Sequence, residues 1–144
     1  MKRVTLFCDG SALGNPGPGG CGVILRYGSI ERELSGGDVH TTNNQMELKA
    51  VIEGLKALKE SCEVTIVSDS SYVVKGITEW LGGWIKKDFK NIKNPNLWKE
   101  YIEVAKGHKI DALWVRGHNG HTENERCDIL AKNEALKIKE AIND

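Results

Sequence analysis

Residues 4–20 read VTLFCDGSALGNPGPGG, a pattern that predicts a β-strand ending in a glycine-rich turn. Side chains alternate along a strand, so Leu6 and Cys8 would point to one face of a sheet, and Phe7 and Asp9 to the other. Because apolar residues lie on both faces, we expect a central strand that is covered on each side. Asp9 would lie at the strand end, where a charge is costly unless a hydrogen-bonded turn or a metal ion compensates it. Taken alone, Asp-Gly favours the turn.

The composition is typical of a globular protein and predicts a single domain over residues 1–144. Hydrophobic residues make up 40% of the chain and charged residues 28%, and the formal net charge is zero. This balance argues against coating nucleic acid by bulk electrostatics, although it leaves room for a local basic patch. With no apolar run near about 18 residues and no leader before the first strand, we expect no membrane association. The cysteines form no CxxC pair, which favours free thiols in a cytoplasmic location.

Hydrophobic periodicity predicts an α/β fold in which helices cover a mixed sheet. The expected strands are residues 4–9, 21–27, 29–35, 64–68 and 112–116, and the first three would form an antiparallel meander. The expected helices are residues 45–60, 72–81, 97–106 and 125–142. Residues 36–44 are expected as a loop whose last residues, TTNN, can cap the first helix. Gly82 and Gly83 are expected to interrupt the second helix, and a basic segment with four lysines follows at residues 84–96.

Three further carboxylates fall where the pattern predicts burial. Glu47 lies in the first turn of its helix on the apolar stripe of Val51 and Leu58, although an acid there also complements the helix dipole. Asp69 directly follows a buried strand and precedes a helix, where an isolated aspartate is commonly an N-cap. Asp128 opens an apolar stripe of the last helix, where a partly buried salt bridge is the alternative.

Together these acids suggest a metal site that none of them suggests alone. Four acids that converge within a few ångströms could not all stay ionised without cations between them. Carboxylate oxygens suit Mg²⁺ or Mn²⁺, and a pair of such ions about 4 Å apart serves in-line displacement at phosphorus. Residue spacing does not establish the convergence, so the turn, cap and salt-bridge interpretations stay open at this point.

Four segments, taken in order, resemble the signature segments of type 1 ribonuclease H: FCDGSALGNPGPGG, TTNNQMEL, VSDSSYVVKGITEW and RGHNGHTENERCDILA. The resemblance covers nearly the whole chain. It implies a ribonuclease H-like fold, with a five-stranded mixed sheet flanked by helices on both faces. It also implies an endonuclease that hydrolyses the RNA strand of RNA–DNA hybrids with two Mg²⁺ ions, which Mn²⁺ can replace. The products would carry 5′-phosphate and 3′-hydroxyl ends.

The resemblance also assigns catalytic residues. The four metal-binding acids of the family fall on Asp9, Glu47, Asp69 and Asp128. Asp9 would bridge both ions. His118 falls on the mobile histidine of the family, which is thought to shuttle protons or to assist product release. A zinc site built from His118, His121 and Cys127 is a weaker alternative, because no fourth ligand is evident.

Further positions match family residues that hold the hybrid duplex. Recognition of RNA requires contacts to 2′-hydroxyls across a wide, shallow minor groove. The matching amides, which can donate and accept hydrogen bonds, are Asn15, Asn43 and Asn44. Turn and cap roles are their alternative. Thr42 matches a residue that grips a phosphate of the DNA strand, and Tyr72 and Trp80 match the lining of the DNA channel. Gly10 and the glycines after it would let the backbone approach nucleic acid closely.

Residues 82–97 resemble the basic handle that helps hold substrate in several family members. The contacts expected there are Trp84, Lys86 and Lys87. The lysines would act through phosphates and weaken as salt rises, whereas a solvated loop is the alternative for any one of them. Phe89 replaces a tryptophan found in many relatives, and the stretch after it is shorter than in long-handle members. We expect no separate hybrid-binding domain and no obligate protein partner, so that a monomer binds the hybrid.

Three other functions are open from the sequence. They are a catalytically inactive hybrid-binding module, a related nuclease such as a transposase or junction resolvase, and a nucleotide-binding protein that uses GNPGPGG. The presence of all four acids and of His118 argues against the first. The TTNN segment and the handle argue against the second. The third lacks the Gly-Lys-Ser/Thr ending of a phosphate-binding loop.

Overall fold

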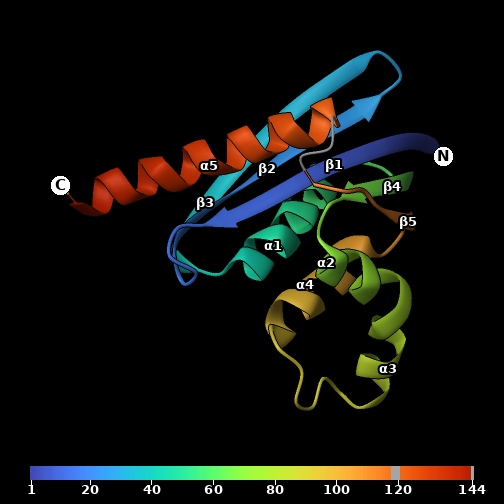
Figure 1. Ribbon diagram of the computed structural model, residues 1–144. Coiled ribbons are helices and arrows are strands. Elements are labelled where there is room, and N and C mark those ends of the chain that lie inside the picture. The colour runs from blue at the N-terminus through green and yellow to red at the C-terminus, as the bar shows by residue number, and fades with distance from the viewer. Residues whose placement is uncertain (118–120, 144) are drawn as a thin grey trace.

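The computed structural model describes residues 1–117 and 121–143 and has a five-stranded sheet with helices on both faces (Figure 1). The strands are β1 (Lys2–Ala12), β2 (Gly17–Tyr27), β3 (Ile30–Thr41), β4 (Cys62–Ser68) and β5 (Lys109–Trp114). The helices are α1 (Asn43–Lys56), α2 (Ser71–Lys75), the π-helical turn η1 (Gly76–Trp80), α3 (Leu81–Lys86), α4 (Pro95–Ala105) and α5 (Thr122–Asn143). Within the described residues, no helix combines the length and the apolar character needed to cross a bilayer.

β1 is the central strand, as its alternating pattern predicts. The strand order is β3-β2-β1-β4-β5, in which β1 pairs antiparallel with β2 and parallel with β4. Leu6 is fully buried and faces Gly54 of α1, whereas Phe7 packs with Ile24 and Val67 on the opposite face. β3 pairs antiparallel with β2, and β5 parallel with β4. The predicted mixed sheet with three antiparallel strands at its start is therefore confirmed.

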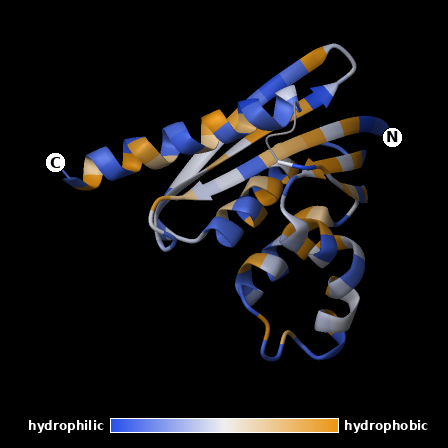
Figure 2. Cartoon of the chain, viewed as in Figure 1, coloured by the Kyte–Doolittle hydropathy of each residue, from blue (hydrophilic) through white to orange (hydrophobic). Residues whose placement is uncertain are grey.

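α1 and α5 cover opposite faces of the sheet. α1 packs on β1 and β2 with α4 against it, and α5 lies across β1, β2 and β3 (Figure 1). The approach of α5 depends on Gly20 and Gly22, because a Cβ at either position would overlap the backbone of α5 at Ala131 or Cys127. In Figure 2 the middle of β1 is hydrophobic, while α5 alternates between hydrophobic and hydrophilic residues, as a helix with one buried face should.

β3 is longer than predicted and continues to Thr41 through residues expected to form a loop. Gly36 pairs with Cys21 of β2 in this added stretch. Glycine has a low strand propensity, but pairing with β2 beneath α5 overrides that local preference. α1 therefore begins at Asn43, two residues earlier than predicted, and Thr42 forms a capping box with Gln45.

The predicted interruption at Gly82 and Gly83 is wrong, because α2, η1 and α3 follow one another without a break. The chain leaves the helix after Lys86 instead, through residues 88–94, of which four have positive φ.

Two helices begin closer to the N-terminus than predicted. α4 begins at Pro95, since proline suits the first turn of a helix, and α5 begins at Thr122. β5 covers residues 109–114 rather than 112–116, in register with β4.

Trp98 of α4 organises the helical lobe formed by α2, η1, α3 and α4. Its side chain is fully buried, and its ring lies 5.1–5.8 Å from the rings of Tyr72, Trp84 and Tyr101. The indole Nε1 donates a hydrogen bond of 2.8 Å to the Tyr72 hydroxyl. Gly76 lies against the same indole, where a Cβ would overlap the ring. The lobe therefore closes only with glycine at the start of η1.

Replacing Gly76 by alanine should destabilise the protein by about 1–3 kcal/mol, because the added methyl group overpacks the Trp98 contact. Gly82→Ala is the matched control. A Cβ at Gly82 meets nothing within 4 Å, so alanine should stabilise this exposed helical position by roughly 0.5–1 kcal/mol. Urea unfolding of both variants measures the difference. Equal effects of the two substitutions would contradict the packing argument.

Candidate active site

Three of the four predicted acids lie together at one edge of the sheet. Asp9 is on β1, and Asp69 follows the last residue of β4. Glu47 lies just after the first turn of α1 and not in it as predicted, because the helix begins at Asn43. One carboxylate oxygen of each lies within 4.8 Å of the others. The parallel ladder of β1 and β4 ends at Phe7 and Val67, so the acids two residues further along lie where these two strands separate. Asp9 itself is still paired with Gly22 of β2. The convergence that residue spacing left open is present for these three side chains.

Gly10 allows the close approach that places Glu47 beside Asp9. A Cβ at Gly10 would overlap the backbone of Met46 and Glu47, so only glycine lets this part of α1 lie directly against β1. The Gly10 amide also donates a hydrogen bond of 2.9 Å to Asp9 Oδ1. We expected Gly10 to make room for nucleic acid. The structure gives it a different role, because the backbone that comes close to it belongs to α1.

Burial perturbs the two inner carboxyl groups. Asp9 is 7% exposed and Glu47 8%. Burial raises the pKa of Asp9 from 3.8 to about 6, and the charges of Asp69 and Asp128 act in the same direction, against hydrogen bonds with Glu47 and Gly10. Burial also raises the pKa of Glu47 well above its usual range, with a further contribution from the charge of Asp9. Folding therefore brings these two carboxyl groups together at the expense of their ionised forms.

The cluster suits a hard divalent cation. Glu47 Oε2 is buried and has no hydrogen-bond partner in the described part of the chain. A buried carboxylate oxygen is costly to leave unpaired, and a cation compensates both that oxygen and the neighbouring negative charges. The donor set consists of carboxylates from Asp9, Glu47 and Asp69, which is the oxygen-rich ligand type that Mg²⁺ and Mn²⁺ prefer.

Asp128 lies on α5 and does not belong to the three-carboxylate cluster. Its side chain is 18% exposed, and its Oδ2 lies 3.0 Å from Lys132 Nζ one turn along the helix. The partly buried salt bridge considered from the sequence is therefore present. The charge of Asp128 nevertheless raises the pKa of Asp9, so this fourth acid lies close enough to act on the cluster.

Asp69 is not the N-cap of α2, and that interpretation is wrong. Ser70 takes the position and accepts a hydrogen bond of 3.2 Å from the Val73 amide. The Asp69 carboxylate joins the acid cluster instead. Its backbone carbonyl accepts a hydrogen bond of 3.0 Å from Trp114 Nε1 at the end of β5. This hydrogen bond ties the end of β4, which carries Asp69, to the neighbouring strand β5.

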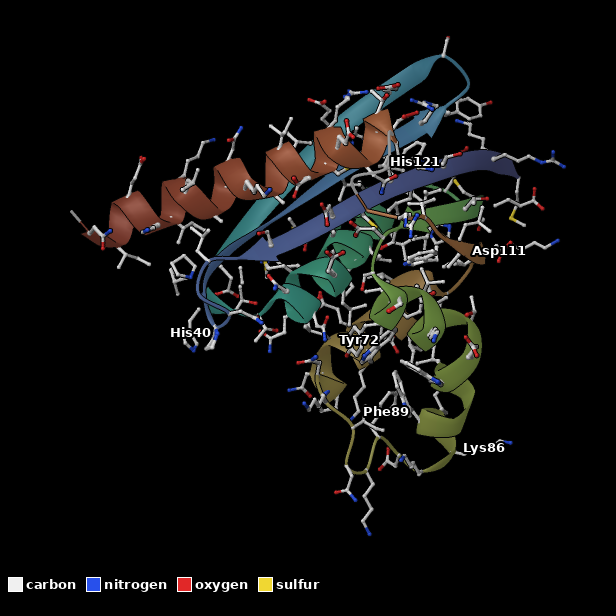
Figure 3. All side chains as sticks on the ribbon, in the orientation of Figure 1. His40, Tyr72, Lys86, Phe89, Asp111 and His121 are labelled. Atoms are coloured by element: carbon white, nitrogen blue, oxygen red, sulfur yellow. The ribbon has the colours of Figure 1, made fainter. Side chains whose placement is uncertain are left out.

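The candidate proton shuttle His118 lies outside the described residues. Two members of the alternative zinc site are described. Cys127 is fully buried against Phe7 and Ile24, and burial raises the pKa of its thiol to about 12. Zinc binds the thiolate, so this environment disfavours Cys127 as a ligand. His121 is exposed next to the start of α5 (Figure 3).

Four predicted substrate contacts line one groove at the start of α1, one helical turn before Glu47. The groove has a volume of about 470 Å³, and its lining residues are Asn15, Thr42, Asn43, Asn44, Lys93 and Asn94. The backbone N–H of Asn43 donates a hydrogen bond of 2.9 Å to the side-chain Oδ1 of Asn15. The side-chain Oδ1 of Asn43 accepts one of 2.7 Å from the backbone N–H of Ala12. These bonds tie the β1–β2 turn to the start of α1. The turn role of the amides is therefore present, while Thr42 rather than Asn43 caps the helix.

Asn94 was not singled out from the sequence, yet it joins this groove to the helical lobe. Its Nδ2 donates to the Tyr72 hydroxyl at 3.1 Å, and its Oδ1 accepts from Gln45 Nε2 at 3.1 Å. Its one sequence signal is the Asn-Pro pair that starts α4, which indicates only a helix boundary. Nothing in the sequence marks Gln45, which donates to Asn94, apart from its position in the capping box of α1.

The remaining predicted substrate contacts lie on the helical lobe (Figure 3). The Tyr72 hydroxyl is already held by Trp98 and Asn94. Trp80 is 40% exposed and lies 5.8 Å from the half-buried ring of Trp84. The structure places Lys86 and Lys87 in exposed positions at the end of α3. Neither lysine lines the groove or belongs to the acid cluster.

The family model described as RNase H matches residues 1–136. A ribonuclease H from Campylobacter concisus is 63% identical over 140 residues, which cover 97% of each chain. A ribonuclease HI from Helicobacter pylori is 58% identical over 137 residues, or 95% of this chain and 96% of that protein. Among solved structures, LC9-RNase H1, a type 1 RNase H with the type 2 active-site motif, has a TM-score of 0.89 and 34% identity. The match covers 95% of this chain and 74% of that one.

In metal-free buffer the free energy of unfolding should fall as pH rises from about 4 to 6. The folded-state pKa of Asp9 is raised from 3.8 to about 6, so its stabilising contribution is complete below the lower value and lost above the higher one. Asp9→Asn should therefore flatten this dependence and stabilise the protein at pH 7 by on the order of 1–3 kcal/mol. Denaturant unfolding in EDTA at several pH values tests this. The exposed Asp111→Asn should behave as wild type, and a less stable Asp9→Asn protein at pH 7 would contradict the prediction.

Proposed function

The chain belongs to the ribonuclease H family and is a nuclease of that class, and we propose that it is an endonuclease hydrolysing the RNA strand of RNA–DNA hybrids. The observation that carries this proposal is the cluster of Asp9, Glu47 and Asp69, of which the first two are buried, together with an amide-lined groove that begins one helical turn before Glu47. A buried group of like charges is a poor structural element, since it opposes folding. It is an effective site for cations at which a phosphodiester can be held and cleaved.

Asp9, Glu47 and Asp69 would hold Mg²⁺, with Mn²⁺ able to replace it, and Asp128 would complete a two-ion site with substrate present. Bound ions of this kind supply an activated water and stabilise the leaving oxygen, which would give 5′-phosphate and 3′-hydroxyl ends. The oxygen donor set and the unpaired Glu47 Oε2 support the assignment. Asp128 would exchange its contact with Lys132 for this role.

The protein residues contribute positioning and charge. Glu47 and Asp9 are fixed on rigid elements whose backbones touch at Gly10, so their oxygens need no rearrangement before binding. Because the pKa of Glu47 is raised well above its usual range, this carboxyl group would release its proton as a cation binds. We also propose His118 as the group that moves a proton or assists release of the product.

The groove of Asn15, Thr42, Asn43 and Asn44 would receive the minor groove and the DNA backbone of the hybrid. Amide side chains can exchange hydrogen bonds with 2′-hydroxyls, which distinguish RNA from DNA. Thr42 would contact a phosphate near the positive end of α1, where backbone amides favour anions. Lys93 and Asn94, which line the same groove, would extend this phosphate contact.

The helical lobe would contact the DNA strand. Trp80 offers an exposed aromatic face supported by Trp84, and Tyr72 of α2 binds the groove residue Asn94 through its hydroxyl. Lys86 and Lys87 would bind phosphates without sequence preference as part of the handle at residues 82–97. We further propose a cytoplasmic monomer. Its four free cysteines, all buried, suit a reducing compartment.

Asp9→Asn should abolish cleavage of a labelled RNA–DNA hybrid while the protein stays folded, because it removes one of the charges that would bind the metal. A gel assay with Mg²⁺, Mn²⁺ or EDTA measures this, with RNA duplex, DNA duplex and single-stranded RNA as other substrates. Asp111→Asn, an acid on β5 away from the cluster, should retain full activity (Figure 3). Cleavage by Asp9→Asn at the wild-type rate would refute the assignment of the acids. Cleavage of DNA duplex but not of hybrid would refute the substrate.

Replacing Lys86 and Lys87 by alanine should raise the KM for hybrid and leave kcat nearly unchanged. For every phosphate that the double variant no longer binds, the slope of log KM against log salt should decrease by about 0.9. Lys106→Ala is the control, because this lysine follows α4 and pairs with Glu103. Steady-state kinetics from 50 to 200 mM salt would detect the change. An unaltered salt slope in the double variant would remove these lysines from the proposed handle.

A further inference from the structure

Asn124 reaches from the first turn of α5 to the point where β1 and β4 separate. Its Nδ2 donates to two carbonyl oxygens, that of Cys8 at 3.4 Å and that of Val67 at 3.2 Å. Cys8 directly precedes Asp9, and Val67 lies two residues before Asp69. The β1–β4 ladder ends at this level. One amide group therefore joins the two strands just before each delivers its acid.

Packing alone does not explain an asparagine at this position. Asn124 is 7% exposed, and its Oδ1 is buried without a hydrogen-bond partner among the described residues. An amide that leaves its acceptor unmet in a buried site is costly, whereas leucine, of similar size, would fill the space without that cost. The two bonds made by Nδ2 are therefore the feature that an apolar residue could not replace.

The same helix carries Asp128, the fourth of the predicted acids. Asp128 follows Asn124 by four residues, so the two side chains lie on one side of α5 about one turn apart. The start of α5 is also held on the sheet, because Arg126 pairs with Glu31 at 2.9 Å and with Glu33 at 2.7 Å. Asn124 thus connects a firmly seated helix to both strand ends.

We propose that Asn124 is a positioning residue for the metal-binding carboxylates. It fixes the separation of β1 and β4 where their ladder ends, and it sets the height of α5, and so of Asp128, above that point. Asn124 acts through Asp9, Asp69 and Asp128 and does not itself bind metal or substrate. This inference rests on the proposed metal-dependent nuclease function. Loss of a group that orients metal ligands typically lowers metal affinity or activity about 10–100-fold.

The test compares Asn124→Ala with two variants on the same helix. Ala131→Gly removes a buried methyl group and weakens α5 at a residue that carries neither an acid nor a side-chain hydrogen bond to the strands. Asn133→Ala changes an exposed asparagine. At a temperature where all three proteins are folded, Asn124→Ala should lose about 10–100-fold in kcat on hybrid, with KM changed less than about twofold. Both controls should keep the wild-type kcat.

A second measurement needs no variant and no turnover. In the wild-type protein, Mg²⁺ titration without nucleic acid should shift the NMR signals of the Asn124 side-chain NH₂, because the strand ends it holds carry the ligands. The NH₂ signals of Asn133 should stay in place. This result remains available if Asn124→Ala does not fold.

Calorimetric titration of Mg²⁺ into folded Asn124→Ala should show weaker binding than to wild type.

The outcomes separate this inference from the function on which it rests. If wild type neither binds Mg²⁺ nor cleaves hybrid, the proposed function fails. If wild type does both, and Ala131→Gly loses as much kcat as Asn124→Ala, then Asn124 contributes only to stability. Unchanged Mg²⁺ affinity in Asn124→Ala, or an Asn124 NH₂ signal that does not move while the Gly10 amide does, would likewise overturn the positioning role.

Discussion

The burial of like charges where β1, β4 and α1 meet is the constraint on which the rest of the structure depends. Withdrawing a carboxylate from water costs several kcal/mol, a large share of the roughly 5–15 kcal/mol by which a domain of this size is stable. Glu47 meets this cost by favouring its protonated form, whereas Asp9, with a pKa of about 6, carries the cost of its charge at neutral pH. The core on both faces of β1 supplies the opposing stabilisation, since Leu6 and Phe7 pack on opposite sides of the strand that carries Asp9.

The sequence was sufficient to predict features that follow from a single periodicity. Alternation along β1 correctly predicted a central covered strand, and helical spacing correctly predicted that Glu47 faces inward. Features that depend on two distant segments were not predictable in this way. Gly10 was interpreted as a space for nucleic acid because nothing local shows that α1 will lie against it. Asn94 and Asn124 were missed for the same reason, since the partners of each lie in other elements of the fold.

Local propensity misled where tertiary contacts decide the conformation. Gly36 and Gly37 resemble a loop in isolation, but they form strand pairs with β2 beneath α5. Gly82 and Gly83 resemble a break, but the helix continues through them and ends only after Lys86. In the groove, Asn94 contacts both Gln45 of α1 and Tyr72 of α2. Asn94, one of the amides that line the groove, is therefore held in place by Tyr72 of the aromatic cluster that closes the helical lobe.

The glycines beneath α5 have a consequence for how the chain tolerates changes in length. Gly20 and Gly22 fit the helix backbone at Ala131 and Cys127, so α5 is seated at one rotational setting on β2. Each residue of an α-helix turns its side chain by about 100°. A single insertion between Asn124 and Asp128 would thus rotate one of them away from the strand ends while the other stayed seated. Length variation is consequently compatible with this site only outside that interval, for example beyond the last buried turn of α5 at Ala135.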